Sequence, residues 1–228
     1  MRLSIIIPVF NERATVLALL DRVEGAGADA EIIVVDDGST DGSREIVAER
    51  AREAGGRITL VEHRINRGKG AALVTGMARA SGDYVLFQDA DLEYDPADYG
   101  LLLEVVDGRG AAAVYGSRFG AGRPRMSVRH VVGNRLLTGL TNLLYGSDLT
   151  DMETCYKLIR RDLLQELGVV CNRFDIEPEI TAKLLKRGVT IHEVPISYQG
   201  RSFAAGKKIS WFDFVSAVWT LVRLRLVG

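Results

Sequence analysis

Apolar runs of four to eight residues alternate with longer amphipathic stretches along the first half of the chain. The apolar runs predict strands at 3–10, 31–36, 58–61, 84–88 and 111–115. The stretches between them have helical spacing and predict helices at 14–23, 41–54, 68–80 and 96–106. Strands that alternate with helices of this length form βαβ units, so we predict an α/β fold with a mostly parallel sheet.

The alternation changes after Gly116. A loop rich in glycine and arginine occupies 120–125, and a long helical pattern follows at 128–145. The remaining patterns predict strands at 155–159 and 190–198 and helices at 177–186 and 210–226. Because no repeat or linker interrupts the chain, we predict one domain, residues 1–228. We expect its first half, 1–116, and its second half, 117–228, to bind different ligands.

Composition narrows the class of protein. The 228 residues carry a net charge of −1, which gives no global argument for nucleic acid or an anionic surface. No window approaches the 18 or so uncharged apolar residues of a membrane span. The N-terminus does not resemble a signal peptide, and two cysteines are too few for a disulfide framework. We therefore expect a cytoplasmic protein, with contact at the membrane face as the remaining possibility.

The run 84–88 ends in Asp89-Ala90-Asp91. Ligands in open α/β sheets bind outside the carboxyl ends of the strands, where these two carboxylates stand. Mg²⁺ and Mn²⁺ favour one or two carboxylates together with substrate phosphates. Asp is also a common turn residue, so a turn without a metal is the alternative.

Two further loops carry polar side chains. Residues 35–43 are dense in carboxylates, hydroxyls and glycines, which suit a nucleoside or, alternatively, the cap of the next helix. Arg67-Gly68-Lys69-Gly70 opens a predicted helix, a position that suits an anion. The loop matches neither a Walker sequence nor a dinucleotide fingerprint, which disfavours a dehydrogenase.

Ordered motifs along nearly the whole chain resemble family 2 glycosyltransferases with the GT-A fold. The first set comprises 7–12, 35–42, 66–70 and 88–96. A second set resembles the branch that transfers mannose or glucose to dolichyl or polyprenyl phosphate, and comprises 115–119, 133–134, 150–157, 177–180 and 206–209. One departure is Ala205, where that branch usually has an acidic residue before Gly-Lys-Lys.

The resemblance implies an inverting hexosyltransferase that uses a nucleotide-sugar donor, GDP-mannose or UDP-glucose. It implies contacts to that donor from Pro8, Glu12, Asp37, Lys69 and Asp89. It further implies Mg²⁺ or Mn²⁺ held by Asp89 and Asp91, with Gln88 as a further ligand or a supporting residue. The metal would neutralise charge on the departing nucleoside diphosphate, which makes Asp91 a catalytic residue.

Basic residues gather in the second half, where the resemblance implies a polyprenyl phosphate acceptor. Because Arg binds phosphate in a bidentate manner, we expect Arg118, Arg129, Asn134 and Arg201 to bind the acceptor phosphate. A solvated basic surface remains the alternative for Arg123 and Arg125. A phosphate that is largely dianionic at neutral pH attacks without a strong base.

Orientation by Arg118 would then contribute to catalysis. Asp151 and Glu153 are candidates for a base or for positioning the acceptor, and a polar turn is their alternative. Aromatic residues at 211–222 with flanking Lys207, Lys208, Arg223 and Arg225 suit a helix lying in a membrane interface. A core helix and a dimer contact are equally compatible.

Two other functions remain open from the sequence. A family 2 enzyme that transfers to a saccharide or small-molecule hydroxyl would need a real base and no arginine cluster. A non-catalytic nucleotide-sugar-binding protein is less favoured, because the predicted donor, metal and acceptor residues are all present. The sequence does not distinguish the donor's base and sugar or the oligomeric state.

Overall fold

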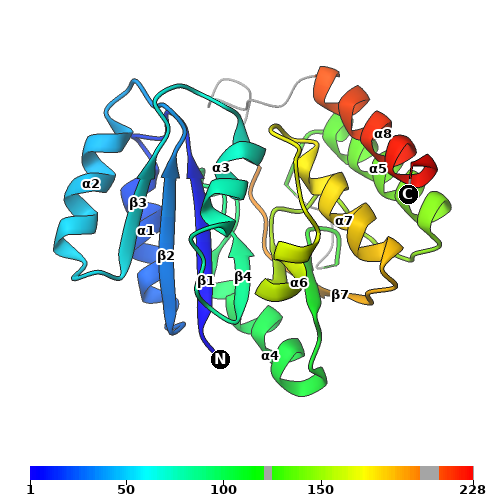
Figure 1. Cartoon of the computed structure of the whole chain (residues 1–228), viewed down its shortest axis with the longest axis horizontal. Coiled ribbons are helices and arrows are strands. Elements are labelled where there is room, and N and C mark those ends of the chain that lie inside the picture. The colour runs from blue at the N-terminus through cyan, green and yellow to red at the C-terminus, as the bar shows by residue number, and fades with distance from the viewer. Residues whose placement is uncertain (121–124, 201–210, 228) are drawn as a thin grey trace.

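The computed structural model describes residues 1–120, 125–200 and 211–227, and within these residues seven strands form one sheet (Figure 1). The order across the sheet is β3-β2-β1-β4-β6-β5-β7. The strands are β1 Leu3–Val9, β2 Ala30–Asp36, β3 Ile58–Glu62, β4 Tyr84–Phe87, β5 Ala113–Ser117, β6 Lys157–Arg160 and β7 Ile191–Pro195.

Four of the strand pairs are parallel, and β6 runs antiparallel to both of its neighbours, β4 and β5. The predicted mostly parallel sheet is therefore confirmed, with one reversed strand that the pattern did not reveal. Strand β2 pairs with one edge of β1, and β4, which comes later in the chain, pairs with the opposite edge of β1. The crevice between the carboxyl ends of β1 and β4 is thus a topological switch point, where such sheets bind ligands.

Helices occupy the predicted stretches with small shifts at their ends. They are α1 Val16–Gly25, α2 Ser43–Glu53, α3 Lys69–Met77, α4 Tyr99–Arg109 with a preceding 3₁₀ turn η1 Pro96–Asp98, α5 Val128–Tyr145, α7 Ile176–Lys186 and α8 Trp211–Leu226. The short helix α6, Arg161–Glu166, was not predicted. Pro96 begins η1 and the Asp95 carboxylate accepts a hydrogen bond from the Ala97 N–H at 3.1 Å, which caps this turn.

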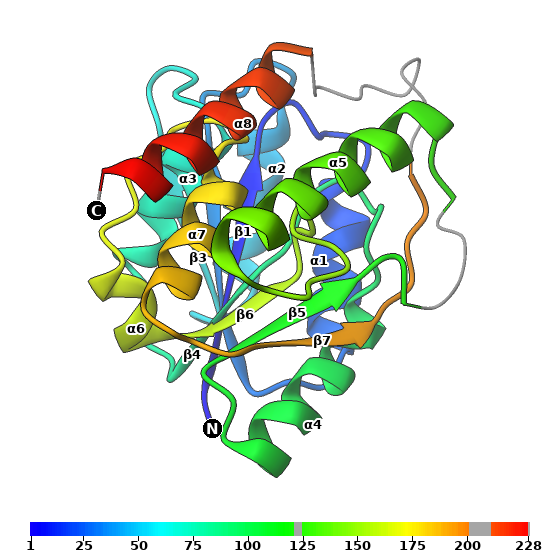
Figure 2. The same ribbon diagram turned by 90° about the vertical axis from the view of Figure 1, so that its right-hand side faces the viewer.

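Two groups of buried apolar side chains hold the elements together. The larger group lies on both faces of the sheet, and the strands β1, β2 and β4 are buried along most of their length. A smaller group, which includes Leu137, Met152, Ala182 and Leu221, lies under α5, α7 and α8. Figures 1 and 2 show α5 and α8 side by side, and the Tyr145 hydroxyl donates to the Leu221 carbonyl at 2.7 Å. Among the described helices, none is both long and apolar enough to span a membrane.

Candidate active site

A cavity of about 940 Å³ opens at the edge of the sheet where the parallel strands end. It gathers predicted site residues from both halves of the chain: Pro8, Glu12, Asp37, Lys69, Asp89, Asp91, Arg118, Arg129, Asn134 and Glu153 all line it. Gln88 and Asp151 do not belong to the lining. Arg201, Ala205, Lys207, Lys208 and Arg123 lie outside the described residues.

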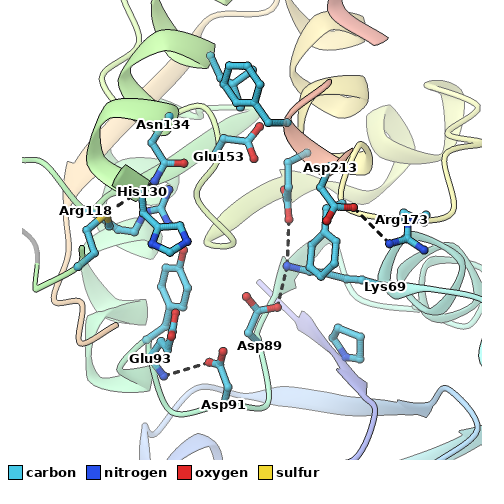
Figure 3. A pocket seen from close by; sticks show the side chains of 18 of the residues that line it. Lys69, Asp89, Asp91, Glu93, Arg118, His130, Asn134, Glu153, Arg173 and Asp213 are labelled. Atoms are coloured by element: carbon cyan, nitrogen blue, oxygen red, sulfur yellow. Dashed lines mark hydrogen bonds and ion pairs between the residues drawn. The ribbon is translucent and has the colours of Figure 1, made fainter. Parts of the chain in front are cut away.

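The loop after β4 presents Asp89 and Asp91 to the cavity (Figure 3). The Asp91 Oδ1 accepts a hydrogen bond from the Glu93 N–H at 3.1 Å, so this carboxylate also makes the turn considered from the sequence. Leu92, which lies between Asp91 and Glu93, has a φ of 62°, a left-handed backbone conformation that is uncommon outside glycine. Strained backbone of this kind concentrates at functional sites.

Lys69, at the start of α3, forms an ion pair with Asp89 at 2.7 Å and another with Glu177 at 3.2 Å. Burial by itself lowers the pKa of this amine, but the neighbouring carboxylates, chiefly Asp89, hold the pKa well above its ordinary value. The ammonium therefore stays charged and balances Asp89. The structure places Lys69 beside the metal-ligand candidate and in the same cavity as the other predicted donor contacts.

The side chains of this loop fit a divalent cation that shares its coordination with a substrate. Among the described residues, no group of three or more His, Cys, Asp and Glu side chains could enclose a metal by itself. Asp89 and Asp91 supply the two carboxylates that Mg²⁺ typically takes when phosphates complete the shell. The donor set is consistent with an ion that binds together with a nucleoside diphosphate.

Gln88 is not available to that ion. Its Oε1 accepts hydrogen bonds from the Tyr99 and Tyr156 hydroxyls, each at 2.6 Å, and the side chain is fully buried. An amide oxygen has two lone pairs, and both are occupied. The prediction of Gln88 as a metal ligand is therefore corrected: this residue anchors two tyrosines beneath the loop.

The loops that follow β1 and β2 are bonded to each other, and residues of both line the cavity. The Asn11 N–H donates to the Ser39 Oγ at 3.0 Å, and the Thr40 N–H donates to the Asn11 Oδ1 at 2.8 Å. Asp41 accepts from the N–H of Ser43, the first residue of α2, at 3.0 Å, although the N-cap position itself is Gly42 and has no side-chain cap.

The two adjacent carboxylates of this segment have different surroundings. Asp36 is fully buried and its Oδ2 accepts from the Arg44 Nε at 3.1 Å. Asp37 lines the cavity and accepts from the main-chain N–H groups of Arg67 at 2.9 Å and Gly68 at 2.8 Å. Only the second of the pair is placed to meet a ligand.

The glycines that open α3 have a packing role besides any anion contact. A Cβ on Gly70 would lie 2.3 Å from the Cys171 carbonyl oxygen, and one on Gly68 would lie 2.3 Å from that of Asn172. Gly68 also has φ of 97°, which favours glycine. The Ala71 N–H donates to the Asn172 carbonyl at 3.1 Å, which joins the two halves of the chain at this point.

Arg118 follows β5 and is held by Asp151. The carboxylate accepts from the Arg118 Nε and Nη2 at 2.7 Å each and from its main-chain N–H at 2.9 Å. Although burial lowers it, the pKa of Arg118 is held well above its ordinary value by the Asp151 charge. Asp151 is itself fully buried, so the prediction of Asp151 as a base is corrected: it orients Arg118 toward the cavity.

Glu153 is the acidic side chain of this turn that faces the cavity. Its Oε1 is buried and has no hydrogen-bond partner among the described residues. Burial raises the pKa of Glu153 to about 7, against the lowering influence of the nearby Lys157 ammonium. A carboxylate with a pKa near neutrality, aimed into a cavity, is suited to accept a proton.

Lys157 is a site residue that the sequence analysis did not assign. Its ammonium is fully buried and donates to the Met152 carbonyl at 2.9 Å, to the Thr154 carbonyl and to the Glu177 Oε2 at 2.7 Å. It therefore fixes the turn that carries Glu153. The sequence did carry one signal of this role, a charged residue inside the apolar run 155–159.

The far wall of the cavity is apolar. Val128, Val132 and Leu136 of α5 line it together with Trp211 and Phe214 of α8, whose rings stack at 5.4 Å. Arg129 and Asn134 lie on the same helix α5 and also line the cavity. Arg173 and Asp213, which the sequence analysis did not single out, form an ion pair at 3.4 Å on this side.

A mostly parallel sheet with paired carboxylates after its central strand β4 gives the chain the GT-A architecture, and its sequence shows that it is a glycosyltransferase. The chain belongs to a family described as Glycosyl transferase family 2, whose sequence model matches residues 4–168. Both the predicted fold and the predicted enzyme class are confirmed.

Several named proteins are similar in sequence. Glycosyltransferase AglJ of Haloferax volcanii is 30% identical over 199 residues, which cover 86% of this chain and 63% of that protein. Polyprenol monophosphomannose synthase of Mycolicibacterium smegmatis is 29% identical, with 90% and 80% covered. The chain thus spans less than two thirds of AglJ but most of the mannose synthase.

Solved structures share the fold. Glucosyl-3-phosphoglycerate synthase from Mycobacterium tuberculosis, in complex with Mn²⁺, UDP-glucose and phosphoglyceric acid, superimposes with a TM-score of 0.75 at 22% identity. That match covers 100% of this chain and 80% of the synthase. Mannosyl-3-phosphoglycerate synthase from Rubrobacter xylanophilus has a TM-score of 0.74 at 20% identity, with 98% and 72% covered.

Proposed function

We propose that the protein transfers a hexose, with inversion, from a nucleotide sugar to a polyprenyl phosphate in a metal-dependent reaction. The observation that carries this proposal is the lining of the cavity described above. Carboxylates with Lys69, the Arg118 guanidinium with Glu153, and apolar side chains of α5 and α8 all line it. A nucleoside diphosphate with a metal, together with an acceptor that has a phosphate head and an isoprenoid tail, matches that combination of surfaces.

The donor end takes the nucleoside diphosphate of GDP-mannose or UDP-glucose. Pro8, Glu12 and Asp37 contact the nucleoside, and Asp89 and Asp91 hold Mg²⁺ or Mn²⁺. When bound, the metal neutralises charge on the leaving diphosphate. Support comes from the M. tuberculosis synthase, whose complex contains Mn²⁺ and UDP-glucose.

The acceptor end takes the phosphate on Arg118, with Arg129, Asn134 and Arg201 as further contacts. Asp151 fixes the guanidinium through two hydrogen bonds, which leaves its outer face to the phosphate. The second pKa of a phosphate monoester is near 6, so part of the acceptor still carries a proton. Glu153, with its pKa of about 7, accepts that proton as the phosphate oxygen attacks.

The names of two relatives support a lipid phosphate acceptor. One is the polyprenol monophosphomannose synthase, and the other is an undecaprenyl-phosphate 4-deoxy-4-formamido-L-arabinose transferase of Edwardsiella ictaluri, 29% identical over 90% of this chain and 62% of that protein. A second candidate function is transfer to a hydroxyl. The raised pKa of Glu153 favours it, because a hydroxyl nucleophile requires a base.

An acceptor panel tests the two functions. The protein is incubated with Mn²⁺ and either GDP-mannose or UDP-glucose, and release of nucleoside diphosphate is measured with a polyprenyl phosphate, with saccharide acceptors and with no acceptor. Release that depends on the lipid phosphate is the expected result. Release with saccharides alone would establish hydroxyl transfer, and no release with any acceptor would contradict both functions.

Two substitutions on α5 test the apolar wall. Leu136 and Leu143 are both exposed on the same helix, but of the two only Leu136 lines the cavity. Leu136→Asp is expected to raise the KM for a long-chain polyprenyl phosphate by roughly tenfold or more, because burying a charge beside an isoprenoid tail is unfavourable. Leu143→Asp is expected to leave the KM for a detergent-dispersed acceptor unchanged. Equal effects of the two changes would contradict the assignment.

We also propose that α5 and α8 together contact a membrane surface. Both helices carry exposed apolar side chains along one line: Val128, Val132, Leu136 and Leu143 on α5, and Trp211, Val215, Trp219 and Leu226 on α8. Arg129, Arg135, Arg223 and Arg225 flank these lines and complement anionic headgroups. Both helices also line the cavity, so a lipid acceptor would enter it from the bilayer.

Co-sedimentation with anionic liposomes tests this surface. We expect the wild-type protein to sediment with vesicles, and Trp219→Asp to remain largely in solution because Trp219 is 63% exposed. The same variant should keep its activity on a water-soluble isoprenyl phosphate, since Trp219 does not line the cavity. A wild-type protein that does not sediment would refute the membrane contact without affecting the acceptor assignment.

A further inference from the structure

His63 is a buried histidine to which the sequence analysis assigned no role. It follows β3 directly and is 6% exposed, and its main-chain N–H donates to the Asp36 carbonyl at 2.8 Å. Both ring nitrogens have a partner. The Nδ1 lies 2.6 Å from the Asp37 Oδ1, and the Nε2 lies 2.9 Å from the Thr75 Oγ1 on α3. The ring therefore connects a helix of the core to a carboxylate of the cavity.

Hydrogen-bond chemistry sets the direction of this connection. An ionised Asp37 only accepts, so the His63 Nδ1 carries the proton that it donates. In the neutral ring the Nε2 then accepts from the Thr75 hydroxyl. The contact fixes the plane of the carboxylate, because a buried carboxylate held by a ring cannot rotate without losing its partner.

The Asp37 carboxylate in turn fixes the loop 66–68. Its Oδ1 also accepts from the Arg67 N–H and its Oδ2 from the Gly68 N–H, at 2.9 and 2.8 Å. Gly68 immediately precedes α3, and the next residue, Lys69, forms the 2.7 Å ion pair with Asp89. A continuous path thus runs from His63 through Asp37 to the start of α3 and the loop after β4.

We propose that His63 is a positioning residue of the sugar-donor subsite. It touches no substrate. It holds Asp37 so that the carboxylate both closes the 66–68 loop and keeps its place in the cavity wall. This inference rests on the proposed function only for the donor end, and it is independent of the identity of the acceptor.

Direct binding of nucleotides tests the proposal. The Kd of GDP and of UDP is measured by calorimetry on the full chain with Mn²⁺. His63→Leu is expected to raise the Kd roughly tenfold, and His63→Asn, whose amide nitrogen takes the place of Nδ1, to restore it within about threefold of the wild type. Thr75→Val, which removes only the hydroxyl, is expected to raise the Kd about two- to fivefold. With active enzyme, the donor KM should follow the Kd while kcat at saturating donor stays nearly constant.

A control substitution at another histidine and a measurement of thermal unfolding distinguish a positioning role from an effect on stability. His192→Leu, on β7 and outside the cavity lining, should leave the Kd unchanged. A His63→Leu protein with lower Tm but wild-type Kd, or a His63→Asn protein as weak as His63→Leu, would overturn the proposal. If His63→Leu does not fold, an unchanged Kd in Thr75→Val overturns it instead. A wild-type chain that binds neither nucleotide would refute the donor end itself, and a lipid that is no acceptor would leave this inference standing.

Discussion

Replacing Glu153 by glutamine tests the chemistry assigned to the middle of the cavity. The substitution keeps the shape of the side chain and removes its ability to ionise. Burial raises the pKa of this carboxyl from 4.5 to about 7 in the folded protein. Between these two pH values the folded chain retains a proton that the unfolded chain has released, so the stability of the wild type must depend on pH.

The direction and magnitude of this pH dependence follow from the linkage between proton binding and folding. Because the folded pKa is the higher one, the associated stability is fully present below pH 4.5 and is lost as the pH rises through about 7. The shift corresponds to about 3 kcal/mol at most. Glutamine has no such dependence. Glu153→Gln should therefore be more stable than the wild type above about pH 8 and nearly equal to it at low pH.

Thermal unfolding of both proteins across this pH range measures the effect. For a chain of this length, about 3 kcal/mol corresponds to a difference in Tm of roughly 6–12 °C at alkaline pH. Activity should change in the opposite direction. The wild-type kcat/KM is expected to rise through about pH 7. Glu153→Gln should be lower, because a positioned base contributes roughly 10²–10⁴-fold, and should keep only the dependence near pH 6 that ionisation of the phosphate acceptor gives.

Glu179→Gln is the matched control, since it makes the same chemical change with the opposite sign. Burial raises the pKa of Glu179, but hydrogen bonds from the Lys183 ammonium and the Cys171 N–H outweigh it, so the pKa is lowered. The stability that the ionised Glu179 carboxylate contributes is present above pH 4.5 and is lost as the pH falls through the lowered pKa of this residue. A Tm difference between wild type and Glu153→Gln that is constant with pH would refute the reasoning about Glu153.

Three further substitutions, one of them with a matched control, have defined outcomes. Asp91→Ala should abolish turnover and metal-dependent nucleotide binding, and retained turnover would refute the metal assignment. Asp151→Asn should lower the free energy of unfolding by about 3–5 kcal/mol, because it leaves the charge of a buried arginine without its carboxylate partner. Chemical denaturation measures this loss, and a loss below about 1 kcal/mol would contradict the prediction. Gly70→Ala should cost about 1–3 kcal/mol through its 2.3 Å approach to Cys171, whereas Gly100→Ala, with no atom within 4 Å, should be neutral or slightly stabilising by the same measurement.

The half of the cavity that we assign to the donor could be predicted from the sequence because its residues follow apolar strands directly. A run such as 84–88 identifies a buried strand, and the carboxyl ends of parallel strands meet at one edge. Asp37, Asp89 and Asp91 could therefore be grouped before any coordinates were known. Their grouping depends on local pattern alone.

The errors concern side chains whose partners are distant in the sequence. Gln88 follows the same strand as Asp89, but the hydroxyls of Tyr99 and Tyr156 occupy its amide oxygen. Asp151 is a carboxylate in a plausible turn, but its partner Arg118 lies 33 residues earlier. His63 likewise acquires its role only through contacts with neighbouring loops. Pattern analysis identifies which residues have suitable chemistry, and long-range contacts decide which of them remain free to use it.

The reversed strand β6 explains why the acceptor half was harder to predict. In a parallel strand only the residues after the carboxyl end reach the site edge. Because β6 is antiparallel to β4, with Leu86 opposite Leu158, its amino end lies at that edge. The turn before β6 therefore delivers Asp151 and Glu153 beside the loop that carries Asp89. A parallel strand at this position would have carried the same turn to the opposite edge of the sheet. The residues that we assign to the sugar donor and to the acceptor thus come from independent loops. We therefore expect substitutions in the 151–154 turn to alter acceptor use without changing the strand ends proposed to bind the nucleotide.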